Sequence, residues 1–516
     1  MATQVLTYIG RAQPLRLPRQ GADVDEQLVI IGGNTAGLAA ALAARRRRAD
    51  LRILVLEASG EISWGACGLP YNLADPTRAP EDLRVRPAAF FHEQDIQLAL
   101  GQRVLAVDPT ARRLQLERRG AGGVERLELA WDRLVVASGA RSRELTIPGL
   151  PATRLAPLKT LDDLRAWKER LGGLRRVAVA GAGPLGLELC EALRQLGLEV
   201  LLVDPEPLPL KGWPRELRAA VAAELERQGV RLRLGWSIRR AEDQPLACRL
   251  ELESPAGGTA LEEVELVAAC AGITPNTEFL PRSLERTAAG ALAVSAALRV
   301  GGLPVWAAGD CACREPAVPA RAGESARVWN PQAREALTGG RVAGWNAAAG
   351  ADERQATPGT LTQVLRCFGL ELARCGRLSE PDEVAAAPAV VDIPPVSGLL
   401  GLGMARAARP SAAAPAAVRR SRAAGQTLGH ALPGAGRLEV WLEAEPDGRL
   451  RGGAILSEGC GGALRINPLA ALLQRAGTAA ELAALDLAYS PPFGPLADPL
   501  LRAAEHLSQP SAAPLP

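Results

Sequence analysis

A single cysteine, Cys67, stands among small residues in the stretch ISWGACGLPYNLA, residues 62–74. The next cysteine along the chain is Cys190, so no neighbour in the sequence could close a short disulfide with Cys67. A thiolate can attack a sulfur or an oxygen, and a thiol without a partner is oxidised to a mixed disulfide or a sulfenic acid. The stretch therefore predicts redox chemistry at one thiol, with a buried structural cysteine as the alternative.

A glycine-rich turn precedes this thiol, in QLVIIGGNTAGLAAALAARRRRADLRILVLEAS. Gly32, Gly33 and Gly37 would allow a tight turn between an apolar strand and a helix that lies close to it. The start of that helix would face a pyrophosphate, and Glu57, at the end of the second strand, would accept ribose hydroxyls. Asn34 replaces the middle glycine of the fingerprint, so an ordinary strand–turn–helix unit is the alternative.

A second unit, RRVAVAGAGPLGLELCEALRQLGLEVLLVDPEP, carries the full fingerprint. Its glycines are Gly181, Gly183 and Gly186, and Asp204 ends its second strand. A carboxylate at Asp204, with no arginine beside it, favours NADH over NADPH. Two dinucleotide units in one chain predict that a hydride passes from a nicotinamide to a flavin.

Two further stretches mark short strands followed by small-residue turns. One is LVVASGARSRELTIPG, residues 134–149, which contains Ser138 and Gly139. The other is LPVWAAGDCACREP, which places Asp310 at the end of a strand.

This order of motifs resembles the FAD-dependent pyridine nucleotide-disulfide oxidoreductases, and ISWGACGLPY resembles their single-cysteine branch. That branch includes coenzyme A-disulfide reductase, NADH oxidase, NADH peroxidase and the persulfide or polysulfide reductases. The string LDLAYSPPFGPLADPLL matches a C-terminal segment of the branch, and the resemblance extends from about residue 27 to 506. It implies an α/β fold of two Rossmann-like domains, an FAD domain interrupted by an NAD domain, followed by a C-terminal α+β dimerisation domain.

The resemblance also implies roles for particular residues. Cys67 would be the redox-active thiol at the start of a helix, where the helix dipole favours the thiolate and the pKa of the thiol is expected to be lowered. Glu188 would lie near the nicotinamide, with an exposed helix acid as the alternative, and Tyr489 would reach the active site of the partner subunit in a homodimer. Asp310 would contact the flavin's ribityl–pyrophosphate region. Ser138 and Gly139 match a turn in the FAD domain.

Several positions bear on the substrate. Thr35 stands where peroxide-reducing relatives carry a histidine, which argues against a peroxidase or oxidase. Arg46 and Ser63 fall at positions that hold coenzyme A in the branch, and the run of arginines at 45–48 could meet phosphates or form a solvated helix end. Leu432 occupies the position of a second tyrosine of the branch, which puts coenzyme A disulfide in doubt and leaves persulfides or polysulfides of small thiols open.

Composition excludes other classes of protein. The 60 basic and 57 acidic residues nearly balance, so nothing favours nucleic acid as a partner. Nine cysteines without a CxxC pair predict neither a disulfide framework nor a metal site and favour a reducing compartment, the cytoplasm. The apolar run at 28–44 is interrupted by three glycines, an asparagine and a threonine, so we expect no membrane segment.

The chain divides into parts whose boundaries follow these motifs. We expect an N-terminal extension at 1–25, an FAD-binding domain at 26–150 and 271–350, an NAD(P)-binding domain at 151–270, and a dimerisation domain at 355–510. Within the last part, residues 381–428 are rich in Ala, Pro and Arg and are interpreted as a loose, low-complexity insertion.

The sequence therefore predicts an NADH-driven FAD flavoprotein that reduces a small disulfide, persulfide or polysulfide through one cysteine. An NADH oxidase or peroxidase, and a non-catalytic flavoprotein that serves as a redox partner, are the alternatives.

Overall fold

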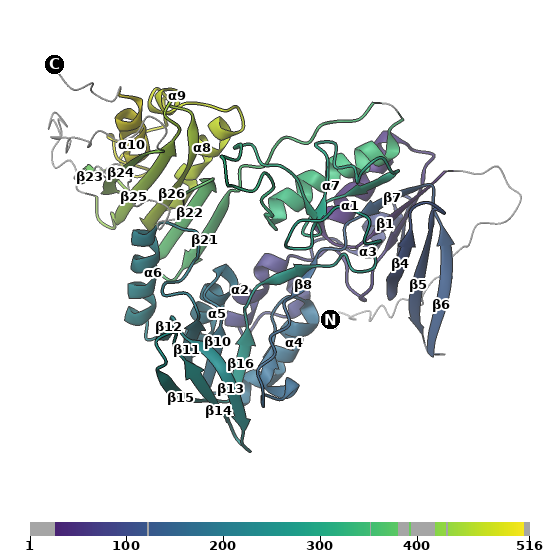
Figure 1. The fold of residues 1–516 in the computed structure, drawn as a ribbon, viewed down its shortest axis with the longest axis horizontal. Coiled ribbons are helices and arrows are strands. Elements are labelled where there is room, and N and C mark those ends of the chain that lie inside the picture. The colour runs from purple at the N-terminus through teal and green to yellow at the C-terminus, as the bar shows by residue number, and fades with distance from the viewer. Residues whose placement is uncertain are drawn as a thin grey trace, which may run out of the picture.

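The computed structural model describes residues 26–120, 123–350, 352–379, 392–393, 418–429 and 432–509. Three β-sheet units form a V in Figure 1, with the second unit at its apex and the first and C-terminal units on its two arms. The extension predicted at 1–25 lies outside the described residues. The α/β class predicted from the two glycine-rich units is confirmed.

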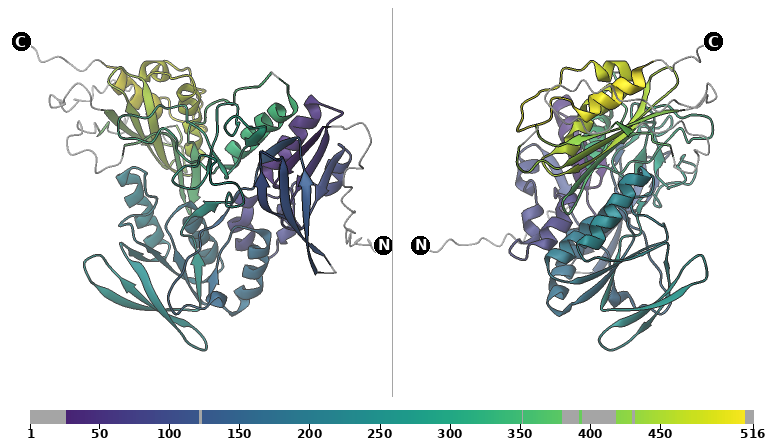
Figure 2. Two further views of the ribbon diagram at one scale, coloured as in Figure 1. Left: turned by 45° about the vertical axis from the view of Figure 1, so that its right-hand side comes forward. Right: turned by 90° about the vertical axis from the view of Figure 1, so that its left-hand side faces the viewer.

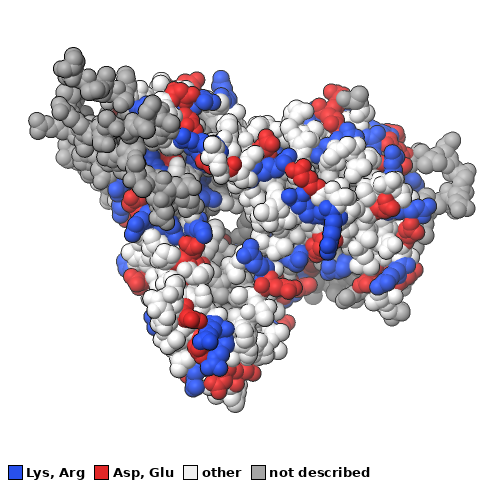
Figure 3. All heavy atoms as spheres, in the orientation of Figure 1, with Lys and Arg blue, Asp and Glu red and all other residues white. Residues whose placement is uncertain are grey.

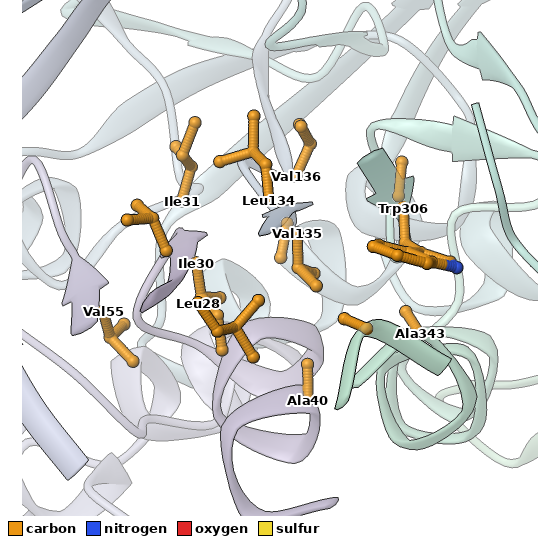
Figure 4. Packing of buried hydrophobic residues seen from close by; sticks show 14 of the residues in the cluster. Leu28, Ile30, Ile31, Ala40, Val55, Leu134, Val135, Val136, Trp306 and Ala343 are labelled. Atoms are coloured by element: carbon orange, nitrogen blue, oxygen red, sulfur yellow. The ribbon is translucent and has the colours of Figure 1, made fainter. Parts of the chain in front are cut away.

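The first sheet is parallel and has the strand order β19-β7-β1-β2-β3. Its strands are β1 (Gln27–Ile31), β2 (Arg52–Leu56), β3 (Ile96–Ala99), β7 (Arg133–Val136) and β19 (Val305–Ala307). They are short apolar runs because both faces of a parallel sheet are covered. Figure 4 shows their side chains packed with Ala40 and Ala343 from two helices. Because β19 follows the whole second unit in sequence, the chain leaves this sheet and later returns to it.

Two helices, α1 (Thr35–Arg47) and α7 (Ala333–Ala348), pack closely against each other over this sheet. The contact depends on glycines of α7. A Cβ at Gly340 would lie 2.2 Å from the carbonyl oxygen of Ala36, and one at Gly344 would lie 2.0 Å from that of Ala40. The return of the chain to the first unit is therefore fixed by helix packing as well as by β19.

The second sheet is also parallel, with the order β12-β11-β10-β16-β9. Its strands are β9 (Leu155–Ala156), β10 (Arg176–Ala180), β11 (Glu199–Asp204), β12 (Arg231–Leu234) and β16 (Leu266–Ala269). Its helices are α4 (Leu161–Arg170), α5 (Pro184–Gln195) and α6 (Arg215–Arg227). This unit lies within the interruption of the first.

The chain crosses between the two units twice, and the two crossings pair with each other. β8 (Ala140–Ser142) runs out and β17 (Ile273–Pro275) runs back as an antiparallel pair. Each unit also carries a three-stranded antiparallel sheet, and Figure 2 shows that of the second unit projecting from it. The strands are β4 (Gln102–Asp108), β5 (Arg113–Gly120) and β6 (Gly123–Ala130) in the first, and β13 (Ser237–Asp243), β14 (Cys248–Glu253) and β15 (Thr259–Val264) in the second.

The C-terminal unit is a six-stranded sheet in the order β21-β22-β26-β25-β24-β23, with helices packed against it. Its elements are β21 (Gln363–Cys367), β22 (Leu370–Gly376), β23 (Asp392–Ile393), β24 (Arg419–Gln426), β25 (Arg437–Ala444), β26 (Leu450–Glu458), α8 (Ile466–Leu473), α9 (Ala479–Ala483) and α10 (Pro499–Ser508).

The insertion predicted at 381–428 needs correction at its end. Arg419–Gln426 is a strand that pairs along its whole length with β25. The arginines make this strand difficult to recognise from the sequence. In the structure Arg420 and Arg422 form ion pairs with carboxylates on β25. Residues 381–391 and 394–417 of that segment lie outside the described residues.

No helix in the described part of the chain is long and apolar enough to cross a membrane. On the face shown in Figure 3, basic and acidic side chains are interspersed.

Candidate active site

Cys67 lies in a short 3-10 turn, Ala66–Gly68, that continues directly into α2 (Leu69–Ala74). Cys67 as a residue is exposed although its sulfur is partly desolvated, whereas Leu69 and Leu73 on α2 are buried in the hydrophobic core of the second unit. The segment that carries the thiol thus belongs by sequence to the first unit and packs with the second. This places Cys67 where the two dinucleotide-binding units meet.

Helix α4 of the second unit holds this segment from both sides. The guanidinium of Arg165 lies 2.7 Å from the carboxylate of Glu61, which precedes the thiol in the sequence. Lys168 donates hydrogen bonds from Nζ to the backbone oxygens of Asn72 and Asp75, at 2.8 and 3.0 Å. Lysine at the end of a helix satisfies carbonyl groups that have no partner within the helix. The thiol therefore has a fixed position relative to the second unit.

The charged groups that act on Cys67 are Glu188, Lys159 and Asp310. Burial raises the pKa of the Cys67 thiol, the carboxylate of Glu188 raises it further, and Lys159 acts in the opposite direction. This direction is opposite to the lowered pKa that was expected for Cys67 from the start of a helix. Two nearby carboxylates and the desolvation of the sulfur raise the pKa of the thiol. The dipole of a helix of only six residues lowers this pKa, but too weakly to outweigh them.

Lys159, just before α4, reaches the turn that follows β19. Its Nζ lies 3.3 Å from Oδ2 of Asp310, which is the carboxylate predicted to contact a flavin. Gly309, the residue before it, has φ = +81°, and a Cβ there would lie 2.9 Å from the Cβ of Ala36 on α1. The Gly309–Asp310 turn thus lies against the first turn of α1, the helix of the first glycine-rich unit.

Tyr71 joins the thiol segment to α5. Its hydroxyl donates a hydrogen bond of 3.3 Å to Oε1 of Glu188. Burial raises the pKa of Glu188 to about 7, while the bond from Tyr71 lowers it and Glu191 raises it. Burial also raises the pKa of Tyr71 to about 12, with Glu188 as the second cause. Glu188 is therefore not a freely solvated helix acid, which was the alternative to its predicted role.

The first glycine-rich turn has the predicted shape. Gly32 has φ = +115°, and a Cβ at Gly37 would lie 1.9 Å from the carbonyl oxygen of Gly32, so α1 can approach the strand only without side chains here. The backbone N–H of Gly33 donates a hydrogen bond of 2.8 Å to Oε2 of Glu57. Asn34 makes no capping bond through its side chain and the first turn of α1 has no acid. The N–H groups at this end are therefore suited to a pyrophosphate.

The turn after β7 completes this side of the site. Gly139 has φ = +68°, and its carbonyl oxygen accepts a hydrogen bond from the N–H of Asn276. Nδ2 of Asn276 donates a hydrogen bond of 3.0 Å to the carbonyl oxygen of Ser138. The hydroxyl of Ser138 in turn donates a hydrogen bond of 2.5 Å to the carbonyl oxygen of Asn276. The Ser138–Gly139 turn is thus tied to the returning crossing, close to the start of the antiparallel pair β8–β17.

The second glycine-rich turn repeats the geometry of the first. Gly181 has φ = +117°, and a Cβ at Gly186 would lie 1.9 Å from the carbonyl oxygen of Gly181. No atom lies within 4 Å of the position a Cβ would take at Gly183, so this glycine faces open space. Oδ2 of Asp204 accepts a hydrogen bond of 2.6 Å from the N–H of Ala182. Glu57 accepts the corresponding bond from Gly33 in the first unit. Each carboxylate has lone pairs left for ribose hydroxyls.

Charged side chains follow Asp204 in the second unit. Nζ of Lys211 lies 2.8 Å from Glu206. Arg218 also approaches Glu206, at 3.9 Å, and is largely buried. A 2′-phosphate placed here would face the carboxylates of Asp204 and Glu206. These residues fit the free 2′-hydroxyl of NADH.

The arginine run at 45–48 resolves into distinct roles. Arg45 donates to backbone oxygens of Gln94 and Asp95, Arg47 lies over the ring of Trp345, and Arg48 pairs with an acid. Arg46 is exposed and has no intramolecular partner among the described residues. Three of the four arginines hold α1 in place, and one is available for a ligand.

Ser63, predicted to bind substrate, is buried at 8% exposure. Its hydroxyl accepts a hydrogen bond of 3.1 Å from the N–H of Arg86. Ser63 therefore holds the loop at 84–86, and its predicted contact with a substrate stays a prediction.

Tyr489 is 50% exposed in the C-terminal unit, and no hydrogen bond or ion pair in the described part of the chain joins it to Cys67. Its segment lies beside the one that carries Leu432, since the N–H of Gly429 donates 2.7 Å to the carbonyl oxygen of Pro491. Phe493 and Leu496 in the same segment are exposed as well. The structure thus brings the Tyr489 and Leu432 segments together.

All nine cysteines lie in the described ranges, and only Cys67 and Cys460 are exposed. Cys311, fully buried, lies 3.4 Å from the carbonyl oxygens of Val136 and Ala308. Cys313 is buried too, so both side chains belong to the packed interior. No group of three or more metal-ligating side chains occurs among the described residues.

Two residues of this site were missed in the sequence. Tyr71 follows Cys67 by four positions, and that helical spacing could have placed both on one side of a helix. Lys159 precedes α4 in a stretch, APLKTLDDL, without any signal of a link to Asp310. Only the packing of α4 on the first unit makes that contact.

Comparison with known proteins agrees with this geometry. The family model described as pyridine nucleotide-disulphide oxidoreductase matches residues 26–334. An NADH oxidase of Methanocaldococcus jannaschii is 25% identical over 92% of this chain and 97% of its own. An NAD(P)H coenzyme A polysulfide/persulfide reductase of Pyrococcus horikoshii is 28% identical over 93% and 98%. The solved structure of an NAD-dependent persulfide reductase from A. fulgidus superposes with a TM-score of 0.78 at 25% identity, over 93% and 82% of the two chains.

Proposed function

The chain belongs to the pyridine nucleotide-disulphide oxidoreductase family, and from that premise we propose that it transfers electrons from NADH through FAD to a small disulfide, persulfide or polysulfide, with Cys67 as its redox-active thiol. The observation that carries the proposal is the position of Cys67, exposed at the junction of two dinucleotide-binding units and acted on by Glu188, Lys159 and Asp310.

The residues present fit both cofactors. FAD would be held by the first cradle, with Glu57 on its ribose, and NADH by the second, with Asp204 on its ribose. The open space at Gly183 is the kind of cradle that a pyrophosphate needs, and a side chain would fill it. The remaining FAD contacts are proposed at the Ser138–Gly139 turn and Asp310. When bound, FAD accepts a hydride from NADH and passes the electron pair onward.

The chain's own groups then act on the sulfur. The Cys67 thiolate attacks a sulfur of the substrate, so that the S–S bond of the substrate breaks, a thiolate or sulfide leaves, and a mixed disulfide or persulfide forms on Cys67. The electron pair that FAD would supply from NADH returns this sulfur to the thiolate and releases the second product. The small neighbours of Cys67, Ala66 and Gly68, leave room on both sides of it. Lys159 is the cation that stabilises this thiolate. Helix α4 keeps the thiol in place through Arg165 and Lys168, so that substrate and cofactor meet it from fixed directions.

Sulfur compounds are favoured as substrates for two reasons. A relative of almost the same length is named for coenzyme A polysulfide and persulfide reduction. Arg46 is free to meet an anionic substrate, while Ser63 and Leu432 offer little to a large one. A small persulfide or polysulfide needs fewer contacts than coenzyme A disulfide does.

The C-terminal unit is proposed to form a homodimer. Tyr489, Phe493 and Leu496 are exposed in one segment, and a surface of this kind favours contact with another protein chain. In a dimer Tyr489 would approach the partner's thiol and serve as a hydrogen-bond donor. Sedimentation should give a dimer, and a fully active monomer would exclude this role for Tyr489.

An NADH oxidase is the second candidate, because the relative from Methanocaldococcus jannaschii carries that name. Thr35 at the start of α1 offers no imidazole to stabilise a sulfenate on Cys67. We therefore expect turnover with oxygen or peroxide to be slower than with a persulfide.

The test is Cys67→Ser, with Cys460→Ser as the matched control because Cys460 is the other exposed cysteine. Cys67→Ser should bind FAD and accept electrons from NADH, since neither cradle is altered, yet lose reduction of persulfide, polysulfide and coenzyme A disulfide. Cys460→Ser should keep that turnover. Near-normal sulfur reduction by Cys67→Ser would reject the proposal and favour the redox-partner alternative.

A further inference from the structure

The turn that contains Asp310 is held by a side chain from the loop that follows it. Nε1 of Trp329 donates a hydrogen bond of 2.9 Å to the carbonyl oxygen of Asp310. The carboxylate of the same residue pairs with Lys159 at 3.3 Å. Within the turn, the N–H of Ala312 donates to the carbonyl oxygen of Gly309. Trp329 thus holds the backbone of Asp310, while Lys159 holds its side chain.

A buried arginine of the C-terminal unit fastens the loop that carries Trp329. Arg377 follows β22 directly, and its side chain is almost fully buried. Its Nε and Nη2 donate hydrogen bonds of 2.9 and 3.0 Å to the carbonyl oxygens of Val318 and Ala326. If this loop moved, the buried guanidinium would lose its partners, and that loss is costly. Arg377 therefore keeps the loop against the C-terminal unit.

A second buried arginine holds the middle of the same loop. Arg451 lies on β26, with its side chain 1% exposed, and its Nη2 is 2.5 Å from the carboxylate of Glu324. Its Nη1 is 2.7 Å from Glu445, which belongs to the C-terminal unit. The position of Trp329 is therefore determined by the C-terminal unit, although Asp310 belongs to the first unit.

We propose that Trp329 is a positioning residue for FAD binding, because its indole N–H fixes the turn that presents Asp310. The C-terminal unit supplies this position through Arg377 and Arg451. Trp329 has this role only if Asp310 contacts FAD, which is part of the proposed function. It requires no particular role of Cys67.

The experiment measures the Kd for FAD by serial dilution of the holoenzyme, with free FAD determined from its fluorescence. Trp329→Phe keeps an aromatic ring but loses the N–H, so FAD should bind about three- to tenfold more weakly. Trp345→Phe is the matched control, because Trp345 lies on α7 of the same unit and its Nε1 has no hydrogen-bond partner in the described structure. The Kd for FAD in Trp345→Phe should equal that of wild type.

A double-mutant cycle separates positioning from a general loss of stability. Asp310→Asn should weaken FAD binding, because the carboxylate is lost. Trp329→Phe should then weaken binding less in the Asp310→Asn protein than in wild type, since the two residues act as one unit. Two losses that multiply in full would overturn the proposal, and so would an Asp310→Asn variant that binds FAD as tightly as wild type.

The link to the C-terminal unit has its own test. Arg377→Met removes both donors to the loop, so FAD should bind about two- to fivefold more weakly. Arg154→Met is the matched control, because Arg154 likewise donates to backbone oxygens, those of Gln244 and Glu265, but in the second unit. Its Kd for FAD should not change. Equal effects of the two substitutions would overturn the link.

A Kd for FAD in Trp329→Phe equal to that of wild type overturns the proposal directly. If Trp329→Phe does not fold, Arg377→Met decides, and an unchanged Kd then overturns it. These measurements need no turnover. If Cys67→Ser keeps sulfur reduction, the proposed function fails, while the FAD affinities still decide the role of Trp329.

Discussion

Lys159 forms an ion pair with Asp310, with Nζ 3.3 Å from Oδ2, and this pair joins the second dinucleotide unit to the Gly-Asp turn of the first. Lys159 is also the cation that acts on Cys67, against the carboxylates of Glu188 and Asp310. One side chain thus connects the cofactor turn with the thiol.

Replacing this cation should suppress the thiolate. In Lys159→Gln we expect the pKa of Cys67 to rise, because the cation that favours the thiolate is lost, and alkylation at pH 8 to slow about two- to threefold. Lys211→Gln is the matched control, since Lys211 pairs with Glu206 away from the thiol. Unchanged alkylation in Lys159→Gln would show that its charge is fully screened.

Glu188 should make stability depend on pH. Burial raises its folded-state pKa to about 7 from the usual 4.5, so the folded chain binds this proton more tightly than the unfolded chain. The free energy of unfolding should therefore fall as pH rises from about 4.5 to about 7, by a contribution of about 2–3 kcal/mol at most. Denaturant midpoints of wild type and Glu188→Gln, compared between pH 5 and 8, measure it. Parallel curves would contradict the shift.

Two glycines of the second turn should respond differently to alanine. In Gly186→Ala the new Cβ would meet the carbonyl oxygen of Gly181 at 1.9 Å, so the melting temperature should fall, with a cost of about 1–3 kcal/mol or more. In Gly183→Ala the Cβ enters open space, so stability should hold while NADH binds about tenfold more weakly. Thermal melts and NADH titrations separate the two effects. NADH binding that survives Gly183→Ala would place the pyrophosphate elsewhere.

Asp204 should determine the choice of nicotinamide cofactor. Asp204→Ala removes an acceptor for the ribose hydroxyl and a repulsion for a 2′-phosphate, so the NADH-to-NADPH preference should fall by about tenfold or more. Flavin reduction followed by stopped flow with each cofactor measures the ratio. A wild-type preference for NADPH would show the assignment to be wrong.

Arg46 and Arg45 form a natural pair for testing the anion site. Arg46→Ala should raise the KM for coenzyme A disulfide or persulfide about three- to tenfold and leave the melting temperature unchanged, because Arg46 is exposed without a partner in the described structure. Arg45→Ala should lower the melting temperature, since Arg45 donates to backbone oxygens of Gln94 and Asp95. Equal KM values for wild type and Arg46→Ala would show that Arg46 does not bind the substrate.

Local patterns in the sequence predicted the cradles well. Gly32 and Gly37, like Gly181 and Gly186, are required by turns that span only a few residues, so their spacing alone gives the shape. The hairpin β25–β26, with its turn at Gly448, depends on a similarly short stretch of sequence. The strand β24 was missed because arginines that pair with acids on β25 look like a solvated segment when read alone.

The sequence by itself determined the class of fold and the shape of the two glycine-rich turns, because each turn depends on a few neighbouring residues with strong steric requirements. It also singled out Cys67, whose role stays a proposal. The tertiary structure alone decided the environment of that thiol. Lys159 and Glu188 act on Cys67 from the second unit, and they meet it only because α2 packs into the core of that unit. Electrostatic effects depend on distances between groups far apart in the chain, so the sign of the pKa shift of Cys67 could not be obtained from the order of its residues.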